Sequence, residues 1–158
     1  MTFASRLLRK AALKTFQYLL VAVGEPANVQ LFSGIYDRFA LCILTAIKAE
    51  DAKELKLLFK ELYHCMRVIS ENEDPANRAV LADPAKLQTF GGVLAKACEV
   101  VSKRKQEKAA VIEEKQANGQ IDEEDLEEVH AELYKITAAA TYIGECCNVL
   151  MTVHKEGA

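Results

Sequence analysis

The C-terminal stretch of this chain is apolar on more sides than one helix face requires. Between Ile136 and Val153, a run of 18 residues, the only formal charge is Glu145. A helix that is apolar nearly all round is typical of a protein core or of a membrane span. The run is rich in Ala and Thr and poor in large aliphatic residues, and acidic residues precede it, which disfavours a membrane span. We therefore expect a segment of a longer helical array in which this helix lacks its outer neighbour; an ordinary core helix of a closed bundle is the alternative.

The composition favours a single all-α domain. Of the 158 residues, 51% are hydrophobic and only 3 are Pro and 7 Gly, while strand-like alternation is absent. The charge is uneven, because residues 1–70 carry ten basic and six acidic residues (+4) and residues 71–158 carry ten and seventeen (−7). The positive half has no extended basic stripe, so nucleic-acid binding is disfavoured.

Helical periodicity and capping residues predict five helices. Asp51 is a suitable N-cap for the third, Asp83 followed by Pro84 for the fourth, and Gly119 ends the fourth. A short turn is expected around Pro75–Leu81. The five expected helices are about Phe3–Val23, Val29–Ala49, Ala52–Ser70, Pro84–Ala117 and Asp122–His154. The buried seam expected on the last helix is Leu126, Val129, Leu133, Ile136, Ala140, Ile143, Cys147 and Leu150.

The first and third helices resemble two copies of one pattern. A shift of 46 residues places Phe16 on Leu62 and Leu20 on Met66, and a period of about 40–47 residues with two helices per unit is the HEAT spacing. We therefore predict an α-solenoid fragment of about two and a half antiparallel helix pairs with one extended charged hairpin. The single segment 1–158 divides into a pair at 1–49, a pair with a long second helix at 51–117, and the first helix of an incomplete repeat at 122–154.

The charges on the expected hairpin are ordered. A basic band, Lys103, Arg104, Lys105 and Lys108, lies on the fourth helix, and folding back at Gly119 sets it beside roughly residues 130–135. A run of carboxylates opens the fifth helix. The candidate acidic interaction surface consists of Asp122, Glu123, Glu124, Asp125, Glu127, Glu128, Glu99, Glu113 and Glu114. It predicts an acidic projection that binds basic ligands, or a solvated hairpin in which the two charges partly neutralise each other.

No pattern of catalytic, cofactor-binding or metal-ligating residues is present. The chain lacks a Gly-rich phosphate loop, a GxSxG motif and CxxC spacing, and its three His are scattered. The five Cys fall at or beside apolar helical positions and are expected to be buried, reduced thiols. We therefore expect a protein that is not an enzyme and needs no cofactor.

The order of several short strings resembles a known family. The strings are Arg9-Lys10-Ala11-Ala12, Tyr18-Leu19-Leu20, Phe90-Gly91-Gly92-Val93 and Leu94-Ala95-Lys96, followed by the charged hairpin. In this order they resemble the C-terminal half of karyopherin-β (importin-β-like) nuclear import receptors, most of all the karyopherin-β3 type. That type carries a Gly-Gly pair inside a B helix and a long acidic insertion after it, whereas the insertion here also contains the basic band.

The resemblance implies a HEAT-repeat segment of a transport receptor that shuttles between cytoplasm and nucleus. Such receptors bind basic cargo proteins and Ran-GTP on the inner surface and phenylalanine-glycine nucleoporins on the outer one. It implies no membrane and no direct nucleic-acid partner. The alternative is a helical-repeat scaffold subunit unrelated to nuclear transport. On either reading, the exposed terminal helix is expected to make the fragment self-associate.

Overall fold

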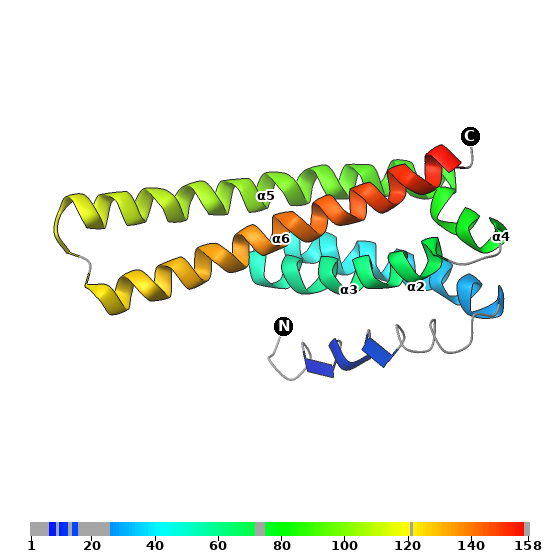
Figure 1. Ribbon diagram of the computed structural model, residues 1–158, viewed down its shortest axis with the longest axis horizontal. Coiled ribbons are helices and arrows are strands. Elements are labelled where there is room, and N and C mark those ends of the chain that lie inside the picture. The colour runs from blue at the N-terminus through cyan, green and yellow to red at the C-terminus, as the bar shows by residue number, and fades with distance from the viewer. Residues whose placement is uncertain are drawn as a thin grey trace.

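The computed structural model describes residues 7–8, 10–12, 14–15, 26–71, 75–120 and 122–156, and within these the regular structure is entirely helical. The expected first helix, Phe3–Val23, lies largely outside the described residues; its described positions are helical. The elements that follow are α2 (Pro26–Lys48), α3 (Ala52–Ser70), α4 (Pro75–Arg78), the short 3-10 helix η1 (Ala79–Ala82), α5 (Pro84–Ala117) and α6 (Glu123–Glu156) (Figure 1). The predicted all-α class is thus confirmed.

The four long helices form two antiparallel hairpins of unequal length. The chain runs up α2, back along α3, then out along α5 and back along α6, so that α3 lies along α6 and α2 along α5 (Figure 1). Helices α5 and α6 each have 34 residues against 23 in α2 and 19 in α3, so their hairpin extends beyond the shorter pair. A helix rises about 1.5 Å per residue, and the extra length therefore becomes a projecting arm.

Helix α3 supplies most of the core. Leu55, Leu58, Phe59 and Leu62 are fully buried on it, and they meet apolar residues of α2, α5 and α6. Fully burying a side chain of this size contributes about 1.5–3 kcal/mol. The core therefore occupies the end of the molecule where all four long helices overlap.

Two tight turns set the ends of the hairpins, and both use the same hydrogen-bond pattern. At the end of α5, the N–H of Gln120 donates to the Lys115 carbonyl at 3.0 Å, with Gly119 at φ 63°. At the end of α2, the N–H of Asp51 donates to the Ala46 carbonyl at 3.0 Å, but here Glu50 holds the left-handed position at φ 49°. Glycine is the usual residue there because it has no Cβ to clash. Glu50 is therefore held by something beyond its local backbone preference.

The helix caps expected at Asp51 and Asp83 are confirmed, whereas α2 begins at Pro26, three residues before the expected Val29. The Asp51 carboxylate accepts from the N–H of Glu54 at 3.0 Å, and the Asp83 carboxylate accepts from the N–H of Ala85 at 3.0 Å. Pro84 follows as the first residue of α5, where its missing N–H costs no intrahelical bond.

The expected seam of α6 is partly wrong. Ile143 and Leu150 are buried as predicted, but Ala140 is exposed and Cys147 only half-buried, while Ala139 and Cys146 are fully buried. The prediction assumed a single stripe facing a single neighbour. Helix α6 packs against both α3 and α5, so its buried face is broader and is centred on a different set of positions. The four expected positions nearest its N-terminus, Leu126, Val129, Leu133 and Ile136, are half-buried.

The helix arrangement is compatible with stacked helix pairs but does not establish a repeat. Helices α3 and α6 run in the same direction side by side, and α2 and α5 do so on the other side (Figure 1). The four contacts α2–α3, α3–α6, α6–α5 and α5–α2 occur both in two stacked helix pairs and in a four-helix bundle. The segment expected as one pair, 51–117, contains α3 and α5, which contact each other less extensively than each contacts α6. The 46-residue repeat requires the first helix, which lies largely outside the described residues.

Candidate functional site: an acidic arm

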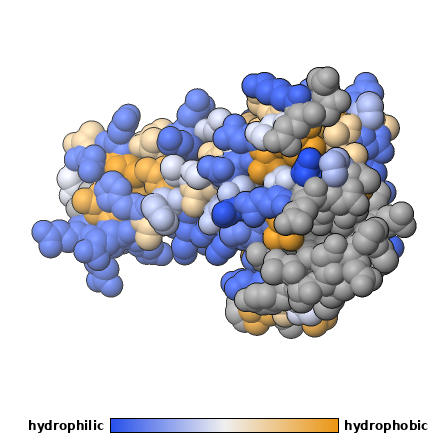
Figure 2. Space-filling model, turned by 45° about the vertical axis from the view of Figure 1, so that its right-hand side comes forward, coloured by the Kyte–Doolittle hydropathy of each residue, from blue (hydrophilic) through white to orange (hydrophobic). Residues whose placement is uncertain are grey.

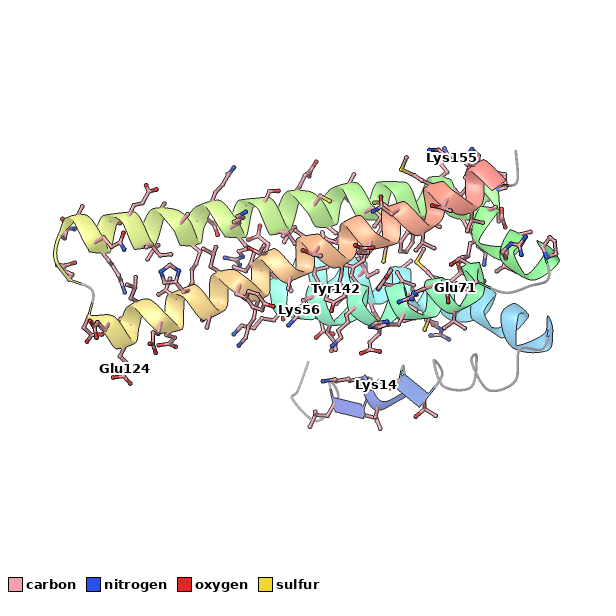
Figure 3. All side chains as sticks on the ribbon, in the orientation of Figure 1. Lys14, Lys56, Glu71, Glu124, Tyr142 and Lys155 are labelled. Carbon is pink, nitrogen blue, oxygen red and sulfur yellow. The ribbon has the colours of Figure 1, made fainter. Side chains whose placement is uncertain are left out.

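The structure gathers eight of the nine candidate carboxylates on the arm, which we define as residues 109–131 of the α5–α6 hairpin. Glu113 and Glu114 lie near the end of α5, and the other six open α6; Glu124 marks this end of the molecule in Figure 3. All eight are exposed. Glu99 is also exposed, but it lies 14 residues before Glu113 on α5, or about 21 Å along the helix, and is not part of the cluster.

The local structure of the arm fixes where the carboxylates point. Asp122 caps α6, because its carboxylate accepts from the N–H of Asp125 at 2.8 Å. Glu123, Glu124 and Asp125 occupy the first turn, where the positive end of the helix dipole favours negative charge. These residues therefore stabilise the helix as well as contributing to the acidic surface. Figure 2 shows hydrophilic side chains projecting from this end of the molecule.

The cations of the basic band pair with residues just outside the arm, at its root, and not with the carboxylates of the arm. Lys108 pairs with Glu132 of α6, which confirms that the band folds back beside residues 130–135. Lys103 Nζ lies 2.6 Å from Glu50 Oε1, and Arg104 Nη2 lies 3.4 Å from Glu50 Oε2. Arg104 Nε also donates to the Glu50 carbonyl at 3.1 Å. These contacts hold Glu50 in its left-handed conformation and tie the arm to the α2–α3 turn.

The electrostatics at the root follow from these pairs. The hydrogen bond from Lys103, with its charge, holds the pKa of Glu50 below its ordinary value of 4.5. The hydrogen bond from Lys108 likewise lowers the pKa of Glu132, and Lys53 and Lys135 add to the effect. All of these groups are at or near the surface, so each pair stabilises the fold only modestly. Their main effect is to place the arm at a defined angle.

The arm itself is left with a strong negative charge. Residues 109–131 contain eight carboxylates and one basic residue, Lys115, which gives a net charge of −7 with His neutral. Within the ranges that the structure describes, none of the eight forms an ion pair. Lys108 of the basic band pairs with Glu132, which is not one of the eight, so no ion pair among the described residues provides the partial neutralisation expected between the band and the acidic run.

A pocket at the arm root was not identified from the sequence. It has a volume of about 580 Å³ and lies between the α2–α3 turn and the two arm helices, with Val111 and Ile136 among its apolar lining and Lys53, Arg104 and Lys108 among its charges. The contacts of Lys103 and Arg104 with Glu50 beside this pocket join residues 53 and 54 positions apart. No local sequence pattern reports such a contact.

The potential metal ligands and the cysteines form neither a metal-binding cluster nor a disulfide among the described residues. No group of three or more His, Cys, Asp or Glu side chains suited to a metal ion occurs in the part of the chain that the structure describes. All five cysteines are free. Burial raises the pKa of Cys65 to about 12 and raises that of Cys146 further, so both stay protonated and unreactive. The expectation that all the thiols are buried is wrong for Cys98, which is exposed on α5.

Helix α6 has the length and composition, over Glu123–Lys155, that would also suit a membrane span, and among the described residues it alone does. Core helices of soluble proteins meet the same criterion, so this is weak evidence. No protein-family model, curated protein or solved structure matches this chain. The functional argument therefore rests on the geometry of the chain itself.

Proposed function

We propose that this chain is a non-enzymatic protein-interaction segment of a nuclear import receptor, and that its acidic arm binds basic segments of cargo proteins. The observation that carries the proposal is the net charge of −7 on the arm, whose eight exposed carboxylates form no ion pair among the described residues. A concentrated field of this kind attracts Lys/Arg-rich partners and speeds their association. The all-helical architecture is compatible with a HEAT repeat, because α3 and α6 run in the same direction on one side and α2 and α5 on the other.

The transport part of the proposal comes from the family resemblance. By that resemblance, Ran-GTP and phenylalanine-glycine nucleoporins are partners of the complete receptor, which shuttles between cytoplasm and nucleus. A pull-down of this chain with Ran loaded with GTP or GDP separates the two readings. Binding that depends on GTP supports a transport receptor, whereas binding of basic peptides without any response to Ran supports a general acidic interaction module.

The acidic arm is tested by neutralising carboxylates that do not cap a helix. A variant with Gln at Glu113, Glu114, Glu127 and Glu128 keeps Asp122 and the first turn of α6 intact. Exposed pairs contribute about 0.2–1 kcal/mol each, so four of them should weaken binding of a Lys/Arg-rich peptide at least about fourfold. Fluorescence anisotropy of a labelled peptide measures the change.

Two controls make this test specific. Asp37→Asn combined with Glu99→Gln removes two exposed carboxylates away from the arm and should leave binding nearly unchanged; Glu127→Gln with Glu128→Gln is its matched pair. The effect of the arm variants should also shrink between 0.1 M and 1 M salt, where the Debye length falls from about 10 Å to about 3 Å. Equal losses in the two pairs, or a loss insensitive to salt, would refute cargo binding by the arm.

A helical scaffold subunit is the second candidate, and the outer face of α6 favours it. Thr137, Ala140, Gly144, Asn148 and Met151 follow one another at helical spacing, carry no charge and are exposed. A face without charges is suited to packing against another helix, which is the basis for expecting self-association. Sedimentation at several concentrations tests this, and a monomer at every concentration would argue against a scaffold assembled through α6.

A further inference from the structure

The accessible side of α3 carries cations and no carboxylate. Successive residues of a helix are about 100° apart, and one arc of about 100° on α3 holds six residues that are all at least partly exposed. We call these residues the basic face: Lys53, Lys56, Lys60, Tyr63, His64 and Arg67. Glu54 and Glu61, the two carboxylates of this helix, lie outside the arc and are buried. The basic face therefore attracts anionic groups.

The three lysines of the basic face are not neutralised by the part of the chain that the structure describes, where they form no ion pair. Arg67 does form one, with Glu71 at 2.9 Å. Glu145 of the adjacent helix α6 is half-buried and pairs with none of the three lysines. Lysines three and four positions apart on a helix repel one another. An anionic partner lying on the basic face would remove that repulsion, and the acidic arm carries the matching charge.

The arm opens an acidic face to the same side of the molecule. Helical spacing places on one face of α6 the exposed carboxylates of Glu124, Glu127 and Glu128. Tyr142 lies 18 residues, or about five full turns, after Glu124 and so faces the same direction. The ring of Tyr142 lies 6.3 Å from that of Tyr63 in the basic face. Figure 3 likewise places Glu124 and Lys56 on the same side of α6.

The charge on this side changes sign at the level of Glu132 and Lys53, which lie close enough for the lysine to help lower the pKa of the carboxyl. Glu124 is eight residues, about 12 Å, from Glu132 towards the tip of the arm. Lys60 is seven residues, about 10 Å, from Lys53 in the other direction, because α3 and α6 run the same way (Figure 1). Opposite charges thus lie at similar distances from one level. A two-fold interface requires this, since each contact occurs twice with the partners exchanged.

We propose that two copies of this chain pair about a two-fold axis near Glu132, with the acidic face of each arm on the basic face of the other copy. Charge complementarity selects this occupant, because the same chain supplies both surfaces in reciprocal positions. The pairing goes beyond the proposed function, since it needs no cargo. It also differs from self-association through the uncharged face of α6, because it is electrostatic and therefore sensitive to salt.

Sedimentation of the complete chain at several concentrations tests the pairing. The wild type should form dimers at 0.1 M salt and monomers at 1 M, where the Debye length is about 3 Å. Two charge reversals, Lys56→Glu with Lys60→Glu and Glu127→Lys with Glu128→Lys, should each raise the dissociation constant of the dimer at least about tenfold. An equal mixture of the two variants should form dimers again, because each arm then meets a face of opposite charge. This recovery shows that both variants are folded.

The matched control is Arg38→Glu with Lys96→Glu, which changes the net charge equally at exposed positions of α2 and α5 outside both faces and should leave the dimer intact. The pairing is refuted by a monomeric wild type at low salt, by a dimer that persists at 1 M salt, by assemblies larger than a dimer, or by a mixture that stays monomeric. Binding of a Lys/Arg-rich peptide separates this outcome from the proposed function. A monomer that binds the peptide refutes the pairing alone, whereas a salt-sensitive dimer that binds no peptide refutes cargo binding alone.

Discussion

Replacing Ile143 by Ala should reveal how strongly α6 is packed into the core. Ile143 is 1% exposed and belongs to the cluster shared by α3, α5 and α6. The substitution removes three carbon atoms, worth about 2.4 kcal/mol at ~0.8 kcal/mol per buried CH₂. The cavity left behind adds to this, and measured Ile→Ala losses span about 2–5 kcal/mol.

The matched substitution is Val111→Ala on the arm. The substitution removes two carbon atoms, and because Val111 is 41% exposed, only about half of their full burial energy is lost. The better helix propensity of Ala offsets part of this loss. The net destabilisation should be about 0.5 kcal/mol. Both residues lie within long helices, so the comparison isolates burial from secondary structure.

Urea unfolding followed by circular dichroism measures the difference. With a slope of about 2 kcal/mol per molar urea, Ile143→Ala should lower the midpoint by about 1 M or more and Val111→Ala by about 0.25 M. The slopes themselves should stay unchanged. Equal shifts for the two variants would mean that α6 is not anchored where the four helices overlap, and the packing described above would be wrong.

Three further outcomes follow from the same structure. Ala139→Leu should lower the free energy of unfolding by about 1–3 kcal/mol through overpacking, while Ala140→Leu should lower it by less than about 0.5 kcal/mol. A lower urea midpoint for Ala140→Leu than for Ala139→Leu would mean that Ala140 is the buried residue, as expected from the sequence. Because the pKa of Glu50 is lowered in the folded state, its contribution is present above its ordinary value of 4.5 and lost as pH falls through the folded pKa. The stability difference between the wild type and Glu50→Gln should therefore shrink in acid, and a difference independent of pH would show that the ion pairs contribute nothing. Iodoacetamide should label Cys98 well before Cys146 in the native protein, as resolved by mass spectrometry, and equal rates would contradict the burial of Cys146.

The ends of the helices were predictable because their signals are local. Asp51 and Asp83 act through hydrogen bonds to residues two or three positions ahead, and Pro84 through its fixed backbone and missing N–H, so the sequence alone located α3 and the start of α5. The register of α6 was not predictable in the same way. Whether Ala139 or Ala140 is buried depends on which two helices flank α6, and that is decided by contacts between segments far apart in the chain.

The candidate site was likewise predictable only where its signals are local. The acidic run at the start of α6 could be read directly, since Asp122 and its neighbours are exposed wherever the hairpin points. The sequence also placed the basic band beside residues 130–135, where Lys108 pairs with Glu132, but it could not show the partner of Lys103 and Arg104. Lys103 and Arg104 bind Glu50 of the α2–α3 turn, 53 and 54 residues away, and the left-handed backbone at Glu50 brings its carbonyl and carboxylate to the same guanidinium. Lys103 lies ten residues before Glu113 on α5, about 15 Å along the helix, so the charge of the arm is set by its own residues, while the contacts at Glu50 fix where the arm begins.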